Sequence, residues 1–383
     1  MPRRSRPSHR RWRDRSLARL RQILAAAACL ASAAAPCAVR ADIPRSTYLT
    51  DVRIDWSSLR RHADESDNYP LTWHADNYLY GAYGDGWGFE RTAVTKRAIG
   101  VSRIGGRPET LTGRDVWEGD AQGGGCCWAP WNGKSWGMVA VGSELQMWFT
   151  IGRPRALGFT EARIATSVDR GRSWRKADWA FTPADGMLMP SFLQLGRGYD
   201  AAGAPPGTAD YVYAYHTRHV RHPAALQSPG AVMLMRVPKG RVRDRAEYRF
   251  YAGSTDAGVA QWADTPAAAV PVLEKPHLLD APPSVSWNRH LGRFLMVMAH
   301  VPPEDPTRRG VAFYEAERPW GPWFEVKRLD QFAEGTIFYF QLPTKWMTAN
   351  GGAVLAFCGP DATQEWDALN TMRIRFLARS GTP

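Results

Sequence analysis

The 383-residue sequence lacks the features that mark several large classes of protein. It has no apolar run of the roughly 18 residues that a membrane-spanning helix needs, and it has neither a heptad nor a collagen-like period. Its five cysteines form no CxxC pair, which excludes a zinc ribbon. The GxSxG and Walker-type motifs are absent, so no serine nucleophile motif or phosphate-binding loop is present. A sustained helical period is also missing, so long amphipathic helices are not expected.

Aromatic residues, glycine and proline are abundant instead, with 17 Trp, 35 Gly and 28 Pro. With 44% hydrophobic residues, this composition excludes intrinsic disorder, because disordered chains lack large apolar groups. Short runs of β-branched and aromatic residues recur between Gly, Pro and Asp turns. They are Tyr78–Tyr83, Ile99–Ile104, Gly137–Val141, Leu145–Ile151, Ala162–Ser167, Tyr211–Tyr215, Ala231–Arg236, Tyr248–Ala252, Ser284–Trp287, Phe294–Ala299, Val311–Glu315, Phe324–Leu329, Ile337–Leu342, Ala353–Cys358 and Met372–Leu377.

These evenly spaced short strands predict a single all-β domain, for which a propeller or a sandwich is a suitable architecture. One motif favours the propeller. Ser167-Val-Asp169-Arg-Gly171-Arg-Ser173-Trp174 matches the Asp-box pattern S-x-D-x-G-x-(S/T)-W. In this turn Asp169 and Ser173 hydrogen-bond the backbone, and Gly171 supplies a positive φ. We therefore predict one β-propeller of about five to seven blades over residues 42–383, with one structural Asp-box turn.

The net charge of +12 comes mostly from the N-terminus. Ten of the 49 basic residues and one of the 37 acidic residues lie in residues 1–41, which leaves a net charge of only +3 on the remainder. A body so close to neutral gives no electrostatic reason to expect binding to nucleic acid. Oxygen-rich loops could bind a structural calcium ion, although no EF-hand spacing is present, and no other cofactor is expected.

Residues 1–41 read as a secretory signal peptide, with an Arg-rich start, the apolar stretch Ile23–Ala35 and small residues before Asp42. Arg10-Arg11 offers a weaker twin-arginine alternative, and a lipid-anchoring cysteine fits poorly. The mature chain is expected in the periplasm or outside the cell, as a monomer without a membrane span.

Removal of the signal leaves three cysteines, Cys126, Cys127 and Cys358. Either of the first two could pair with Cys358, the two neighbours could form a vicinal disulfide, or all three could stay as buried thiols.

Several segments resemble a family of secreted bacterial propeller proteins known as a domain of unknown function, some of whose relatives are similar to endo-arabinan-cleaving glycosidases. The matching segments are Asp67–Trp73, Tyr80–Phe89, Val237–Asp244, Glu317–Trp323 and Leu342–Met347. The resemblance spans most of residues 50–377 and implies a glycan, a polysaccharide or oligosaccharide, as substrate. One departure stands out. Where many relatives carry two acids after the tryptophan of the first segment, this chain has Trp73-His74-Ala75-Asp76.

A glycosidase needs two carboxylates across the scissile bond, one protonated and one ionised, about 5–9 Å apart. Asp76 and Asp85 flank one predicted strand and form the leading pair, with Asp76 as base or nucleophile and His74 tuning it. Asp85 or Glu118 is the expected proton donor. Each of these acids has the alternative role of capping a turn, and that alternative is strong for Asp85 and stronger for Glu118.

Elimination on a uronic-acid polymer needs a proton acceptor and a cation that stabilises the enolate. His74 or His216 could accept the proton, while Lys134 and Arg218 could bind the uronate carboxylate. Tyr215 lies beside His216 and is a further substrate-binding candidate. His216, His219 and His222 form only a weak metal-ligand pattern.

Trp73 and Trp87 are candidates for stacking on a sugar ring, because the apolar face of the ring favours aromatic contact. Glycoside hydrolysis is the favoured function. Elimination and non-catalytic glycan binding are the alternatives. We expect His74, Asp76, Asp85, Lys134 and His216 to converge on one mouth of the central channel.

Overall fold

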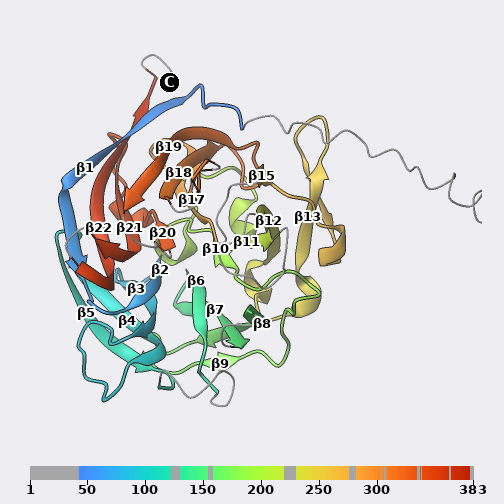
Figure 1. The fold of residues 1–383 in the computed structure, drawn as a ribbon. Coiled ribbons are helices and arrows are strands. Elements are labelled where there is room, and N and C mark those ends of the chain that lie inside the picture. The colour runs from blue at the N-terminus through green and yellow to red at the C-terminus, as the bar shows by residue number, and fades with distance from the viewer. Residues whose placement is uncertain are drawn as a thin grey trace, which may run out of the picture. The chain divides into compact units, whose positions relative to one another are not determined.

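Five antiparallel sheets stand around a central axis and form a five-bladed β-propeller (Figure 1). The computed structural model describes residues 43–121, 130–153, 158–219, 230–275, 282–302, 304–305, 308–333, 337, 339–361 and 364–379. The predicted propeller, with five to seven blades, is therefore confirmed at five. Among the described residues no helix is long and apolar enough to cross a membrane.

Each blade begins with its innermost strand, and the chain then moves outward. Blade 1 contains β2 (Asp67–Trp73), β3 (Leu79–Gly86), β4 (Arg97–Arg107) and β5 (Thr110–Glu118). Blade 2 contains β6 (Lys134–Val141), β7 (Glu144–Arg153), β8 (Gly158–Ser167) and β9 (Arg175–Lys176). Blade 3 contains β10 (Ser191–Phe192), β11 (Tyr211–His219), β12 (Gly230–Pro238), β13 (Arg249–Ser254), β14 (Ala260–Ala263) and β15 (Leu273–Lys275).

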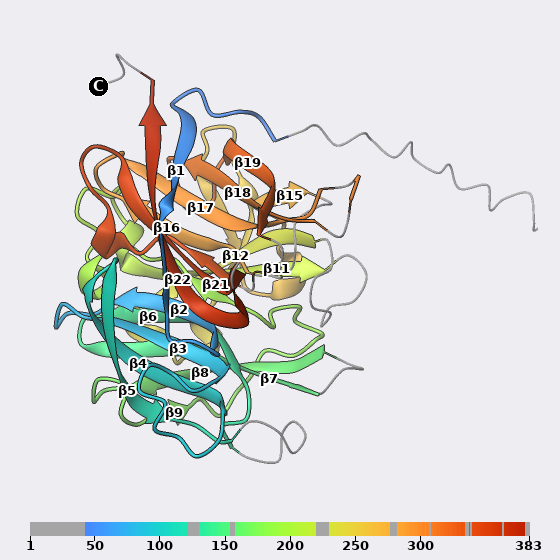
Figure 2. The same ribbon diagram turned by 60° about the vertical axis from the view of Figure 1, so that its left-hand side comes forward.

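Blades 4 and 5 complete the ring. Blade 4 contains β16 (Ser284–Asn288), β17 (Arg293–His300), β18 (Arg309–Ala316) and β19 (Phe324–Ala333). Blade 5 contains β20 (Tyr339–Gln341), β21 (Gly352–Asp361), β22 (Gln364–Ala378) and β1 (Leu49–His62). The outer strand of the last blade is therefore the first strand of the described chain. Figures 1 and 2 both show β1, in blue, beside β22, in red.

The pairing of β1 with β22 closes the ring. It is antiparallel and runs from the Leu49–Ala378 pair to the His62–Leu369 pair. On β1, Leu49 and Val52 are buried, whereas most of the remaining side chains are half-buried or exposed. Closing a propeller with strands from both ends of the chain couples the N-terminal strand to the C-terminal blade.

Side chains on the inner strands connect neighbouring blades around the axis. The Gln341 side chain of blade 5 accepts a hydrogen bond from the backbone N–H of Leu71 and donates one to the Leu71 carbonyl, both at 2.6 Å. Thr72 Oγ1 accepts from the backbone of Ala140 in blade 2 at 2.9 Å. Gln194, after β10, donates to the Met138 carbonyl at 2.7 Å. These buried bonds satisfy polar groups where adjacent sheets approach each other.

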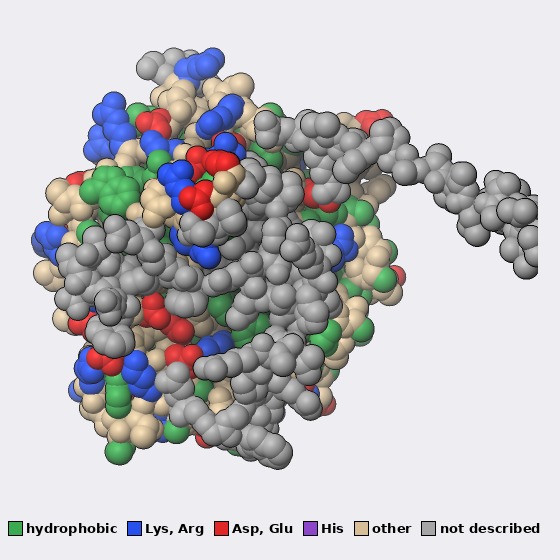
Figure 3. Space-filling model, in the orientation of Figure 1, with side chains coloured by type: hydrophobic (Ala, Val, Ile, Leu, Met, Phe, Trp, Pro, Cys, Tyr) green, Lys and Arg blue, Asp and Glu red, His purple; other side chains and the backbone are tan. Residues whose placement is uncertain are grey.

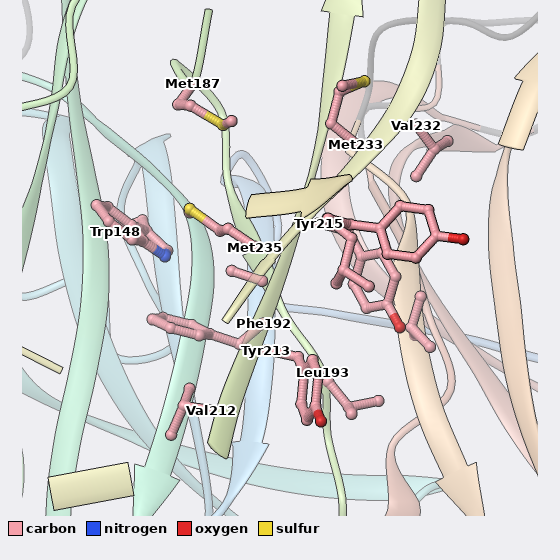
Figure 4. Packing of buried hydrophobic residues seen from close by; sticks show 14 of the residues in the cluster. Trp148, Met187, Phe192, Leu193, Val212, Tyr213, Tyr215, Val232, Met233 and Met235 are labelled. Carbon is pink, nitrogen blue, oxygen red and sulfur yellow. The ribbon is translucent and has the colours of Figure 1, made fainter. Parts of the chain in front are cut away.

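Large apolar side chains fill the spaces between blades. Figure 4 shows the largest cluster, in which Trp148 of β7 faces residues of blade 3. The Trp148 ring is fully buried and stacks on Phe192 with centroids 6.0 Å apart. Aromatic residues that join two sheets explain why the tryptophan count is high, because flat rings bury a large area between blades.

The predicted Asp-box forms the turn between β8 and β9. Asp169 accepts hydrogen bonds from the backbone N–H and the hydroxyl group of Ser173 at 2.9 and 2.6 Å, and from Ser167 Oγ at 2.8 Å. Gly171 has a φ of 81°, as the motif requires. Although burial opposes it, these hydrogen bonds lower the pKa of Asp169 to about 2. The Asp-box is thus a structural turn.

All fifteen predicted strands overlap observed strands. The sequence prediction missed the long strands β1, β2 and β5 and the short strands β9, β10, β14 and β15. In β2 the pattern is concealed by Pro70 and by left-handed backbone at Asn68 and Tyr69, whose φ values are 70° and 57°. Both features are unusual inside strands.

Replacing Gln341 with leucine should destabilise the fold by about 2–5 kcal/mol, since the backbone N–H and carbonyl of Leu71 would both be left buried without a partner. Urea denaturation of wild type and Gln341→Leu measures this loss. The exposed Gln261 gives the control Gln261→Leu, whose stability should change by less than about 0.5 kcal/mol. Equal stability of all three proteins would show that the link from blade 5 to blade 1 does not stabilise the ring.

Candidate active site

The inner strands of the five blades run in the same direction, so their N-terminal ends meet at one mouth of the channel. Asp67 begins β2 and Lys134 begins β6. Asp67 pairs with Gly84 across the β2–β3 hairpin, which brings the next residue, Asp85, to the same end. Asp367 lies near the start of β22, in blade 5. We call Asp67, Asp85, Lys134 and Asp367 the carboxylate mouth.

Asp67 is the most unusual group at this mouth. Its Oδ1 atom is shielded from solvent and has no hydrogen-bond partner among the described residues. The carboxyl group lies against the backbone of Gly84, and a Cβ atom at that glycine would collide with Oδ1. Burial raises the pKa of Asp67 to about 6, and the negative charges of Asp85 and Asp367 contribute, while Lys134 opposes the increase. A carboxyl group in this state can carry a proton near neutral pH.

Asp85 has a different environment. It lies in a strained part of β3 with a φ of 38°, and its side chain is 38% exposed. Lys134 forms an ion pair with Asp85 and also donates to the Ala98 carbonyl at 3.3 Å. The Lys134 cation therefore compensates the negative charge of Asp85, which is open to solvent. Left-handed backbone at a residue other than glycine is often retained at functional sites.

Asp367 completes a set of three interacting carboxyl groups. Its backbone carbonyl accepts a hydrogen bond from the N–H of Glu65 at 2.7 Å, two residues before Asp67. Burial raises the pKa of Asp367, and the charge of Asp85 adds to the increase, while Arg61 and Lys96 oppose it. Among the described residues no three His, Cys, Asp or Glu side chains are grouped so that they could hold a metal ion. The three carboxyl groups therefore affect one another's pKa but do not form a metal-binding cluster.

An apolar cluster that includes Cys358 lies next to the carboxylate mouth. It consists of Trp136, Phe159, Leu188, Met189, Tyr339 and Cys358. Cys358 is a free, fully buried thiol that donates to the Ser66 carbonyl at 3.4 Å. Burial raises the pKa of Cys358, with Asp67 and Asp367 adding to the effect. Cys126 and Cys127, the other cysteines of the predicted mature chain, lie outside the described residues.

His74 and Asp76 do not reach the carboxylate mouth, contrary to the expected convergence. They occupy the β2–β3 turn, and the six residue steps from Asp67 to Trp73 span about 20 Å of strand. Asp76 accepts from the Tyr80 hydroxyl at 2.9 Å and pairs with Arg103 at 3.2 Å. Burial alone would raise the pKa of Asp76, but hydrogen bonds from His74, Tyr78 and Tyr80 lower it. This is the environment of a turn-stabilising carboxylate.

His74 is also held in place within the turn. It is 2% exposed, its Nε2 lies 3.1 Å from the Ser143 carbonyl, and its Nδ1 lies 2.9 Å from Asp76 Oδ1. The expectation of one site failed because a hairpin places the start of its first strand beside the end of its second strand. The two acids that flank β3 in sequence therefore lie at opposite ends of the blade.

The candidates on β11 lie in blade 3. Tyr215 is fully buried and its hydroxyl group donates to the Pro319 carbonyl at 2.7 Å, so the side chain packs in the core. His216 is 1% exposed. Arg218 is exposed and its guanidinium contacts the Ala269 carbonyl at 3.5 Å. β11 is the second strand of blade 3, so these three residues do not lie on an inner strand at the axis.

Glu118, Trp87 and Trp73, the remaining predicted site residues, lie in three different places on blade 1. Glu118, at the end of outer strand β5, forms a two-point ion pair with Arg97 at 2.9 and 3.0 Å. Trp87 follows β3, and its indole N–H donates to Glu65 at 3.1 Å, close in sequence to Asp67. Trp73 ends β2 and therefore lies at the mouth opposite to the carboxylates.

Sequence reasoning missed Asp67 and Asp367 as site residues. Asp67 was the first residue of the family-like segment, but β2 was not predicted as a strand, so nothing placed Asp67 at the axis. No local pattern marks Asp367, whose position depends on the pairing of β22 with β1.

A family model described as "Domain of unknown function (DUF4185)" matches residues 134–355, which is more than half of the chain. The chain belongs to the DUF4185 family. The predicted resemblance to a propeller family of unknown function is thereby confirmed. No curated protein matches the chain.

Solved structures resemble the DUF4185 chain with low sequence identity and low TM-scores. The GH43_1 enzyme from Xanthomonas citri is 14% identical with a TM-score of 0.46, covering 83% of this chain and 92% of that chain. The same enzyme complexed with xylotriose is 13% identical with a TM-score of 0.47, covering 84% and 90%. An endo-arabinase from Bacteroides thetaiotaomicron is 12% identical with a TM-score of 0.45, covering 87% and 98%. Such a likeness concerns the fold and assigns no chemistry.

Asp67→Asn should change stability in a pH-dependent way. Because burial raises the pKa of Asp67 to about 6, folding loses stability as the pH rises from about 4 to about 6. Asp67→Asn removes this loss, so its stability relative to wild type should improve by on the order of 2–3 kcal/mol between pH 4 and pH 7. Urea denaturation at both pH values measures the difference.

Asp76→Asn is the matched control with the opposite sign. The pKa of Asp76 is lowered, so its carboxylate stabilises the fold above its unfolded pKa, and this stability is lost as the pH falls through the folded pKa. Asp76→Asn should therefore be less stable than wild type at pH 7, with a smaller difference at low pH. The burial argument for Asp67 is wrong if Asp67→Asn differs from wild type by the same amount at pH 4 and pH 7.

Proposed function

We propose that the carboxylate mouth hydrolyses glycosidic bonds of a polysaccharide, with Asp67 as proton donor and Asp85 as base or nucleophile. The observation that carries this proposal is the contrast between the two carboxyl groups. The Oδ1 atom of Asp67 is shielded and the pKa of this carboxyl group is raised, whereas Asp85 is 38% exposed and paired with Lys134. Two neighbouring carboxyl groups in unlike environments are what acid–base glycoside hydrolysis requires.

Asp67 and Asp85 have different roles in the proposed reaction. Asp67 gives its proton to the glycosidic oxygen as the bond to the anomeric carbon breaks. Asp85 either takes a proton from the attacking water or attacks the anomeric carbon itself, which would form an ester that water then hydrolyses. These alternatives differ in the anomer that is released. In both, Lys134 compensates the Asp85 charge, and the negative charge of Asp367 helps Asp67 to keep its proton.

Elimination receives less support from the described geometry. It needs a proton acceptor next to a cation that binds the uronate carboxylate. His74 lies at the far end of β2 from Lys134, and its ring nitrogens already face Ser143 and Asp76. His74 and Lys134 are therefore not brought together, and hydrolysis is the proposed reaction.

The proposed setting is the periplasm or the outside of the cell, on the basis of the signal-like residues 1–41. A polysaccharide is the proposed partner. Arabinan is the first polymer to test, because some relatives of the family are similar to endo-arabinan-cleaving glycosidases. On the face shown in Figure 3, acidic and basic side chains lie beside each other in the described part. This mixed surface agrees with the net charge of +3 that remains outside residues 1–41.

Asp67→Asn and Asp85→Asn should each reduce hydrolysis by about 10²–10⁴-fold, since each removes one proton-transfer or nucleophilic group. Wild-type kcat should fall as the pH rises through about 6, where Asp67 loses its proton. Release of reducing ends from a polysaccharide panel that includes arabinan measures both effects. The exposed Asp264 supplies the control Asp264→Asn, which should retain wild-type activity.

Three results would contradict this proposal. Full hydrolytic activity in Asp67→Asn and Asp85→Asn would remove both residues from the reaction. Ultraviolet-absorbing unsaturated products would show elimination. Retardation in affinity gels without any cleavage on the panel would show a glycan-binding propeller.

A further inference from the structure

A cavity lies at the mouth of the channel opposite to the carboxylate mouth, where the inner strands end. It has a volume of about 230 Å³ and opens among residues from several blades. Trp73 ends β2, Trp287 and Arg289 lie at the end of β16, Arg197 follows β10, and Lys345 follows β20. We call Arg197, Arg289 and Lys345 the basic mouth.

Positive charge dominates this cavity. Three cationic side chains from three different blades line it, and Asp200 is the one acidic side chain in the described lining. Burial lowers the pKa of Lys345 and the nearby charge of Arg197 adds to this, while the carboxylate of Asp76 opposes it. Three cations beside a single lining carboxylate leave an excess of positive charge, and a bound anion would relieve the repulsion between them.

The cations of the basic mouth are partly oriented already. Arg197 donates through Nε to the Ala75 carbonyl at 2.9 Å, and Lys345 donates to the Asn77 carbonyl. Both anchors lie in the β2–β3 turn. Arg289 is exposed and has no hydrogen bond or ion pair within the described residues. Its guanidinium therefore has all its donors available for a planar oxyanion.

Two tryptophans add apolar surface to the same cavity. The Trp73 indole N–H donates to Asn77 Oδ1 at 3.0 Å, and that of Trp287 donates to the Ala202 carbonyl at 3.1 Å. Trp73 is half-buried and its polar edge is satisfied, so it offers a ligand apolar surface, whereas Trp287 is only 3% exposed. The cavity is smaller than the roughly 300–1,000 Å³ of pockets for drug-sized ligands, so it has room for one small ring.

We propose that the basic mouth binds a single anionic sugar, a hexuronate, with its carboxylate on Arg289 and Lys345 and its ring against Trp73. The carboxylate matches the charge, and the apolar ring face matches the tryptophan surface. This site is separate from the carboxylate mouth and does not depend on catalysis there. Recognition of a charged sugar unit at the far end of the channel gives this propeller a second carbohydrate contact.

Ligand-observed NMR titration of the full chain with sodium glucuronate, glucose and inorganic phosphate tests this site. Glucuronate should bind, glucose and phosphate should bind at least about tenfold more weakly, and Arg289→Gln and Lys345→Met should each weaken glucuronate binding about tenfold or more. Arg172→Gln, which changes an exposed arginine of the Asp-box turn, is the matched control and should bind as wild type. Asp67→Asn should also bind as wild type, which separates this site from the proposed hydrolase.

The proposal is overturned if glucuronate fails to bind wild type, or if Arg289→Gln and Lys345→Met bind it as tightly as wild type. Phosphate binding as strong as glucuronate binding would show a general anion site and would equally refute recognition of a sugar. Because Arg289 is exposed, its substitution leaves the fold intact, and circular dichroism of each variant verifies this before titration.

Discussion

The antiparallel pairing of β1 with β22 is the interaction on which both the ring and its site depend. The chain leaves β1 at His62 and enters β2 at Asp67, while Asp367 lies on the paired strand. In the short connection the Glu65 N–H donates to the backbone of Asp367 at 2.7 Å. Closing the ring therefore places the carboxyl groups of blades 1 and 5 beside each other, and Lys134 of blade 2 completes the set.

The residues of the carboxylate mouth and their neighbours lower the stability of the folded protein. Asn68 and Tyr69 adopt left-handed backbone directly after Asp67, and Asp85 has a φ of 38°. Such conformations cost about 1–3 kcal/mol each in residues other than glycine. The Asp67 Oδ1 atom is buried without a partner in the described chain, which adds a desolvation cost. Unfavourable backbone and an unsatisfied buried carboxyl oxygen that occur together at one end of the channel indicate a function there, because such costs are often retained at functional sites.

Much of the architecture could be predicted from the sequence because its signals are local. Alternating apolar segments predicted fifteen strands, and Ser167–Trp174 predicted a turn whose hydrogen bonds are observed. β1 escaped prediction because it is an edge strand with few buried side chains, and β2 because Pro70 and left-handed residues interrupt its pattern. The blade count was predicted only as a range, since it depends on how the sheets pack around the axis.

The site was predicted less completely than the fold. Asp85 and Lys134 were both named as candidates, but in different reactions, and the structure joins them in one ion pair. His74 and Asp76 were grouped with Asp85 because they flank the same strand, although a strand separates its two ends by its full length. Asp67 and Asp367 depend on the closure of the ring, which brings residues 300 positions apart into contact and leaves no mark in the local sequence.

Measurement of the Asp67 pKa tests the central claim most directly. Carbon-13 NMR titration of the side-chain carboxyl groups, with Asp67 assigned through Asp67→Asn, follows this group without reference to any substrate. The account predicts a midpoint near 6, well above an ordinary aspartate, and a further increase in Lys134→Met, where the opposing positive charge is gone. A midpoint at or below about 4 in the wild-type protein would contradict it, because the hub would then hold no carboxyl group poised to donate a proton.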